Sequence, residues 1–213
     1  MQKHKIVLLR NAARRGISAF VRQAHLIALD TLLRKKHLVF QADAADILAA
    51  ETPPARDVIF TEILSWEAFC EILARQPLPV PATVDLGSKD WFDSGWRLWI
   101  GEKDQRLACL GWLRTAEQSP QFFCRMKPGS ELLWHVATLP GFLGLNLHIL
   151  LWAIMMRMRI EDGVRSFYTN CRDFNTPSHH NIRKAGFHLI GLAIDSRITG
   201  RRTWHPLPAD TAM

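Results

Sequence analysis

The chain has 213 residues, 48% of them hydrophobic, which suits one large domain, or one domain with a small extension, around a core. Its net charge of +7 is uneven, because residues 1–37 hold nine of the 27 Lys and Arg residues but one of the 20 acidic residues. The four cysteines are widely spaced and form no CxxC pair, which argues against a zinc site. No secretory signal is evident, so we expect free thiols in a reducing cytosol.

The basic N-terminal segment is typical of a helix over residues 11–36. Apolar residues such as Ile17, Phe20 and Val21 recur there at helical spacing, between arginines that supply positive charge. Such a helix could lie on an anionic membrane or nucleic acid, or it could pack with its basic side in water. We therefore expect a basic N-terminal extension over residues 1–56 and a main domain over residues 57–213.

The rest of the chain alternates between strand-like and helix-like segments. In chain order we expect a strand at 37–43, a Pro-Pro linker, a strand at 57–64, a helix at 65–76, a Pro-rich loop, a hairpin at 96–114, a strand at 131–139, a helix at 144–159, a strand at 164–171, a helix at 178–185 and closing strands at 187–198 and 201–208. Strands that alternate with helices after a hairpin predict a mixed sheet covered by helices.

The stretch ATLPGFLGLNLHILL, residues 137–151, could be part of a membrane span or a turn that leads into a helix. A span is worth considering because no Asp, Glu, Lys or Arg occurs from Leu132 to Met156. A membrane span would have to pass through Pro140 and Gly141, and a proline inside a helix costs about 3 kcal/mol or more. The uninterrupted apolar residues also fall short of the roughly 20 that a span needs. We therefore expect a strand that ends at Leu139, a Pro-Gly turn and a helix, with no transmembrane span.

That strand–turn–helix junction predicts an anion site. The amides of Leu143 to His148 would lie unpaired at the start of the helix, where the helix dipole is positive. Gly141 and Gly144 would let the backbone approach a ligand closely. Such a place suits a pyrophosphate.

Two segments together resemble the GNAT superfamily of acyl-CoA-dependent N-acyltransferases. That family follows a central strand with a proline, an aromatic residue and Arg-Gly-x-Gly-x-Gly/Ala, and Pro140, Phe142 and Gly144 fit this pattern. Further on the family has Asn-x-x-Ala-x-x-x-Tyr-x-Lys-x-Gly-Phe, and the residues at the same spacing are Asn175, Ser178, Lys184, Gly186 and Phe187. The resemblance covers roughly residues 57–205. It implies an α/β (α+β) fold with a GNAT-like mixed, mostly antiparallel central sheet flanked by helices.

The resemblance also implies a reaction and a site. Acetyl-CoA or a longer acyl-CoA would be the co-substrate, attacked directly by a small-molecule amine or by a protein or peptide amine. The cofactor residues it implies are Val136, Ala137, Leu143, Gly144, Leu145, Asn146, Leu147, His148 and Asn175. Backbone groups near Val136 and Ala137 would hold the pantetheine and the acyl carbonyl, and Asn175 is either a cofactor contact or a helix cap. The base would be Glu131 or His135, which share a sheet face if the strand is regular.

Three departures from the family pattern bear on function. The loop arginine of the family is Leu143 here, its later glycines are Asn146 and His148, and the tyrosine that often protonates the CoA thiolate is Ile182. The backbone amides that would bind the cofactor remain, because every residue except proline has one. Other candidate acids are His179, His180, Tyr168 and water. A non-catalytic acyl-CoA-binding relative stays open, as does a nucleic-acid- or membrane-binding role for residues 1–37. A homodimer is also left open.

Overall fold

The computed structural model of the chain describes residues 2–51, 57–77, 79–81 and 84–208. In chain order the elements are α1 (Gln2–Ala13), α2 (Ile17–Leu32), β1 (Arg34–Asp43), α3 (Ala44–Ala49), β2 (Val58–Ile63), α4 (Trp66–Ala74), α5 (Lys89–Asp93), β3 (Arg97–Lys103), β4 (Arg106–Thr115), β5 (Glu131–Thr138), the 3-10 turn η1 (Pro140–Phe142), α6 (Leu147–Glu161), β6 (Ser166–Arg172), α7 (Thr176–Lys184), β7 (His188–Ser196) and β8 (Arg202–Pro206).

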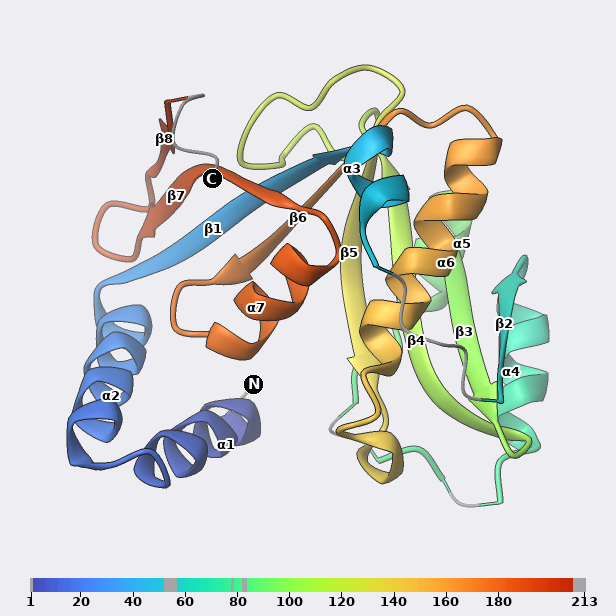
Figure 1. The fold of residues 1–213 in the computed structure, drawn as a ribbon, viewed down its shortest axis with the longest axis horizontal. Helices are drawn as coiled ribbons and strands as arrows, with labels where there is room; N and C mark the ends of the chain where they lie inside the picture. Colours follow the sequence, from blue (N-terminus) through green and yellow to red (C-terminus); the bar gives the residue numbers. More distant parts are fainter. Residues whose placement is uncertain (1, 52–56, 78, 82–83, 209–213) are drawn as a thin grey trace. The chain divides into compact units, whose positions relative to one another are not determined.

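The strands form one sheet in the order β2-β3-β4-β5-β6-β1-β7-β8. The pairs β2–β3, β3–β4, β4–β5 and β7–β8 are antiparallel, and β5–β6 is parallel. The predicted fold class, a mixed and mostly antiparallel sheet flanked by helices, is therefore confirmed (Figure 1).

The chain divides into two compact units, which we describe separately. The large unit comprises Gln41–Thr169 and Ile182–Phe187. The small unit contains α1, α2, β7 and β8 with the adjoining ends of β1, β6 and α7. The predicted division between residues 56 and 57 falls at residues 52–56, which lie outside the described residues, so it stays a prediction.

In the large unit, α6 packs across β3, β4 and β5 (Figure 1). A Cβ on Gly111 of β4 would come within 3.2 Å of both Leu151 and Met155 of α6, so a glycine there lets helix and sheet approach closely. The helix buries eight of its residues, which explains why its sequence is apolar enough to suggest a membrane span. Among the described residues no helix is long and apolar enough to cross a membrane.

The turns of the large unit depend on a few backbone positions. The β3–β4 hairpin turns at Asp104 and Gln105, both in the left-handed region at φ 51° and 60°, as a two-residue hairpin connection requires. After α7, Gly186 has φ +89°, and a Cβ there would lie 2.9 Å from the Asp46 carbonyl oxygen of α3. Phe187 then packs on Trp152, with ring centroids 5.9 Å apart. Gly186 and Phe187 therefore have a structural role.

In the small unit, the expected single helix over residues 11–36 is two helices, and that prediction is wrong. The chain turns at Gly16, whose φ of +111° is not helical, and α1 packs against α2. Asp30, the one acidic residue among residues 1–37, is 5% exposed and forms ion pairs with Lys5 and Arg172. The charges that this helix pair presents to water are therefore basic.

Candidate functional site

The turn between β5 and α6 has an unusual backbone. η1 follows Leu139 directly, and Gly144 then adopts φ +86°. Asn146 adopts φ +56° and precedes the first helical residue, Leu147. Asparagine is one of the few residues that tolerate this left-handed conformation, which glycine adopts most readily. The helix begins three residues later than the predicted start at Gly144, because these two left-handed positions keep the chain out of the helix.

The backbone amides of this turn are unpaired. From Leu143 to His148, no amide donates a hydrogen bond to any part of the chain that the structure describes. The first helical bonds run from the amides of Ile149 and Leu150 to the carbonyl of Asn146. Gly144 and Asn146 are exposed, and an added Cβ on Gly144 would meet nothing within 4 Å. The free amides of Leu147 and His148 lie at the positive end of α6, and four more precede them in the turn, so this backbone is suited to an anion.

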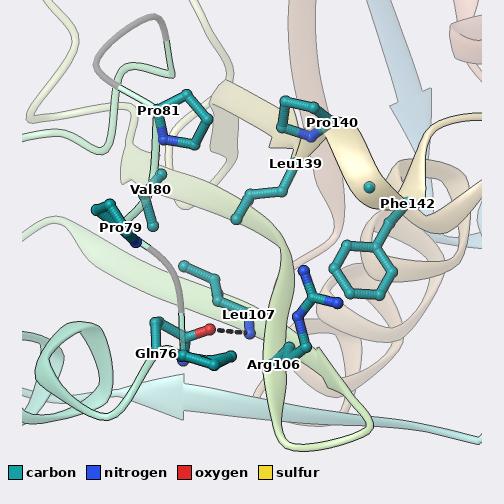
Figure 2. A pocket seen from close by; sticks show the side chains of 11 residues that line it. Gln76, Pro79, Val80, Pro81, Arg106, Leu107, Leu139, Pro140 and Phe142 are labelled. Atoms are coloured by element: carbon teal, nitrogen blue, oxygen red, sulfur yellow. Dashed lines mark hydrogen bonds between the residues drawn. The ribbon is translucent and has the colours of Figure 1, made fainter.

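A cavity of about 130 Å³ adjoins this turn. Figure 2 shows it between a Pro-rich segment around Pro79 and the turn of Leu139, Pro140 and Phe142. On one side Gln76 accepts a hydrogen bond from the amide of Leu107 at 2.8 Å. On the other, the Arg106 guanidinium lies 5.3 Å from the centroid of the Phe142 ring.

The sequence did not indicate Gln76 or Arg106 as site residues. Gln76 lies two residues after α4 and Arg106 begins β4, so neither lies close to the turn along the chain. No motif connects them to it, and only the folded hairpin brings Arg106 beside Phe142.

The central strand β5 contains a β-bulge. Leu113 of β4 pairs with Leu133, but the next pair joins Trp112 to His135, so Trp134 is an extra residue. The extra residue reverses the alternation of side chains along the strand. Glu131 and His135 therefore point to opposite faces of the sheet, and the prediction that they share a face is wrong.

Glu131 lies on the face that α6 covers. Its side chain is 3% exposed, and the Arg159 guanidinium donates three hydrogen bonds to its two oxygens, at 2.8, 2.9 and 3.2 Å. Arg159 also pairs with Asp162. The Glu131 carboxylate therefore ties the start of β5 to the last turn of α6.

His135 lies on the opposite face, beneath the segment that contains α5. Its Nε2 is 2.8 Å from the carbonyl oxygen of Asp85, and its ring centroid is 5.9 Å from that of Trp91. Because a carbonyl oxygen only accepts, Nε2 carries the proton in the neutral ring and Nδ1 has a free lone pair. His135 is half-buried, and its Nδ1 has the chemistry of a general base.

The other predicted cofactor residues lie in two places. Val136 and Ala137 follow the bulge and pair with Gly111 and Leu110 of β4. Asn175 precedes α7 in the small unit, and its side chain accepts from the amide of Ser178 at 3.4 Å, so it acts as a helix cap. A cofactor contact by Asn175 stays a prediction.

Among the residues considered as acids and nucleophiles, Tyr168, Cys109 and Cys171 are buried, whereas His180 and Cys70 are exposed. Ile182 is 1% exposed, and the Tyr168 hydroxyl accepts a hydrogen bond from the amide of Lys127 at 3.3 Å. Burial raises the pKa of Tyr168, and it raises the pKa of Cys109 and of Cys171 to about 12. Thiols with such pKa values are poor nucleophiles at neutral pH. No group of three or more His, Cys, Asp and Glu suited to a metal occurs among the described residues.

Comparison with known proteins identifies the fold. No protein-family model matches the sequence, and no curated protein matches it. Among solved structures, a GCN5-related N-acetyltransferase from Kribbella flavida matches with TM-score 0.50 and 12% identity, over 74% of this chain and 55% of that one. A GNAT-family acetyltransferase from Colwellia psychrerythraea matches with TM-score 0.52 and 11% identity, over 76% and 55%. A Drosophila protein matches with TM-score 0.53 and 13% identity, over 82% and 56%.

The protein therefore has the fold of the GNAT acetyltransferases, and the GNAT-like fold that the sequence predicted is confirmed. The match spans little more than half the length of each of these structures. The sequences have diverged far beyond the range in which a shared fold implies a shared activity.

Proposed function

We propose that the protein binds an acyl-CoA and transfers its acyl group to an amine. The observation that carries the proposal is the row of six unpaired amides, Leu143 to His148, between the central strand and α6 of a GNAT fold. These amides would bind the pyrophosphate of CoA. The loop itself has no Lys or Arg, and burial lowers the pKa of His148. Arg106, beside Phe142, is an exposed cation close to this turn and would add positive charge.

The proposed chemistry is direct attack without a covalent acyl-enzyme. The amine nitrogen bonds to the acyl carbon, the C–S bond breaks and the CoA thiolate leaves. His135 Nδ1 would take the proton from the amine, and water would protonate the thiolate. Backbone groups near Val136 and Ala137 would hold the thioester carbonyl. Glu131 stays the second candidate base, although its two oxygens are occupied by Arg159.

Binding and turnover test the proposal in sequence. A thermal-shift series with CoA, acetyl-CoA and longer acyl-CoA thioesters should raise the melting temperature, because a ligand bound only by the folded state stabilises it. The chain length with the largest shift would then be assayed for release of free CoA thiol in the presence of amines. No shift with any CoA compound would contradict the proposal at its first step.

A non-catalytic acyl-CoA-binding protein is the alternative within the same fold. It is favoured by the buried Ile182 where the family has a tyrosine, and by the Tyr168 hydroxyl that is already hydrogen-bonded. The thiol assay separates the two functions. Thermal stabilisation by acyl-CoA without thiol release from any amine would identify the non-catalytic protein.

A second candidate function concerns α1 and α2, which could contact an anionic membrane surface. Arg14, Arg15 and Arg22 are exposed, as are Ile17 at 84% and Val21 at 59%. Basic residues interleaved with exposed apolar ones suit the headgroup region of a bilayer. Sedimentation with phosphatidylserine vesicles, compared with phosphatidylcholine vesicles, would show it. Binding to nucleic acid but not to vesicles would instead favour a nucleic-acid-binding function for α1 and α2. Separately, sedimentation of the protein alone would show whether it forms a homodimer.

A further inference from the structure

Arg114 occupies an unusual position at the end of β4. Its guanidinium carbon lies 4.2 Å from the ring centroid of Trp96 and 5.1 Å from that of Trp134. Trp96 comes from the segment after α5, and Trp134 is the bulge residue of β5. Two indole rings from distant parts of the sequence thus hold one guanidinium.

This arginine has no anionic partner among the described residues. Arg97, Arg159 and Arg202 each pair with a carboxylate. Arg114 instead donates from Nη2 to the carbonyl of Gln118, and its buried Nε has no hydrogen-bond partner. Burial lowers the pKa of Arg114, as expected for a half-buried cation without a counter-charge. A half-buried guanidinium without a counter-charge destabilises the folded protein unless an anion binds to it.

Arg114 shares a sheet face with His135. On β4, Arg114 and Trp112 are two residues apart and point to the same side, and Trp112 pairs with His135 across the bulge. Diagonal neighbours of this kind lie about 7–8 Å apart between strands. Trp91 contacts both Trp96 and His135. Its ring centroid lies 4.7 Å from that of Trp96 and 5.9 Å from that of His135. One small ligand could therefore contact both the guanidinium and the proposed base.

A cavity lies beyond Gln118, to whose carbonyl Arg114 donates, although Arg114 itself does not line it. The residue after Gln118, Ser119, lines a cavity of about 330 Å³ together with aromatic and apolar side chains that include Phe122 and Met126. Ser119 is 4% exposed, and its hydroxyl has no hydrogen-bond partner. The volume is at the lower end of the range for small-molecule sites.

We propose that Arg114 binds the carboxylate of the amine acceptor, so that the acceptor is an amino acid or a similar small amine bearing a carboxylate. The guanidinium would donate a forked pair of hydrogen bonds to the carboxylate, a geometry that arginine provides and lysine does not. The indoles of Trp96 and Trp134, which flank the guanidinium, would contact an apolar part of the acceptor. This assignment rests on the proposed function, because it identifies the acceptor of that reaction.

The test uses two probes of the same shape, N-acetylphenylalanine with a carboxylate and N-acetylphenylalaninamide with a neutral carboxamide, titrated calorimetrically into the full chain. We expect wild type to prefer the carboxylate by about ten- to hundredfold, as hydrogen bonds to a charged group provide. Arg114→Gln should lose that preference. Arg114→Lys should retain only part of it, and Arg165→Gln, a change at an exposed arginine that precedes β6, should retain it in full.

Two results would overturn the assignment: equal affinity of wild type for the two probes, or an undiminished preference in Arg114→Gln. If Arg114→Gln fails to fold, Arg114→Lys decides, and a full preference in that variant rules out forked recognition. CoA binding is measured on the same samples. If the carboxylate preference holds but CoA does not bind, the proposed function fails while the carboxylate site stands.

Discussion

Replacement of Glu131 by glutamine would separate a structural carboxylate from a catalytic one. Both oxygens of Glu131 accept hydrogen bonds from Arg159, and the two side chains are 3% and 12% exposed. Loss of one partner from a buried ion pair costs about 3–5 kcal/mol. Glutamine keeps one acceptor oxygen, and Arg159 keeps Asp162, whose side chain is 60% exposed. We therefore expect Glu131→Gln to lower the free energy of unfolding by about 2–3 kcal/mol.

Urea unfolding followed by tryptophan fluorescence would measure this loss. Arg159→Gln and the double variant complete a double-mutant cycle. If the ion pair is the cause, the double variant should be less destabilised than the sum of the two single changes, by about 1 kcal/mol or more. Additive losses would show that the two side chains do not stabilise one another.

The same variant distinguishes the two candidate bases by rate. Glu131→Gln should keep thiol release within a few-fold of wild type at a temperature where it is folded. His135→Asn should lose about 10²–10⁴ in rate, because a general base contributes that much. The free energy of unfolding of His135→Asn should remain within about 1 kcal/mol of the wild-type value, since His135 is only half-buried. Reversed behaviour of the two variants would refute the assignment of His135.

The remaining predictions concern protons and thiols. Burial lowers the pKa of His37 to about 4, whereas the unfolded side chain titrates near 6.5, so the unfolded state binds the proton more readily. Stability should therefore be complete above pH 6.5 and fall by up to about 3 kcal/mol as the pH drops toward 4, and urea unfolding of His37→Gln should lack this loss. For direct attack, each single Cys→Ser variant should keep turnover. An acylated cysteine trapped by mass spectrometry, together with loss of activity in the matching variant, would replace that mechanism with a covalent one.

The sequence predicted the elements whose patterns are local. The β3–β4 hairpin follows from two apolar runs around a polar turn, and the turn lies at Asp104 and Gln105. The Pro-Gly junction after β5 likewise follows from Pro140 and Gly141. By contrast, α3 lies where the sequence suggested a linker. It is six residues long, and its start depends on a reciprocal cap between Asp43 and Asp46.

The parts of the site that depend on non-local pairing could not be predicted. The bulge at Trp134 is invisible in the sequence ELLWHVAT, because apolar residues occur there on both faces of the strand. One extra residue decides whether His135 lies with Glu131 or opposite it. The contact of Arg114 with Trp96 and Trp134 joins three segments whose order along the chain carries no motif.

Calorimetric titration of CoA into wild type and two glycine variants tests the proposed binding site most directly. Gly144→Glu and Gly163→Glu put the same side chain on residues at φ +86° and +96°, each with nothing within 4 Å of the new Cβ. The two changes should therefore strain the backbone alike, but Gly144 lies in the turn before α6 and Gly163 lies after its end. We predict that Gly144→Glu weakens CoA binding by about tenfold or more, because its carboxylate would repel the pyrophosphate at the free amides, while Gly163→Glu binds as wild type does. Equal CoA affinity in all three proteins would contradict a site at Leu143 to His148.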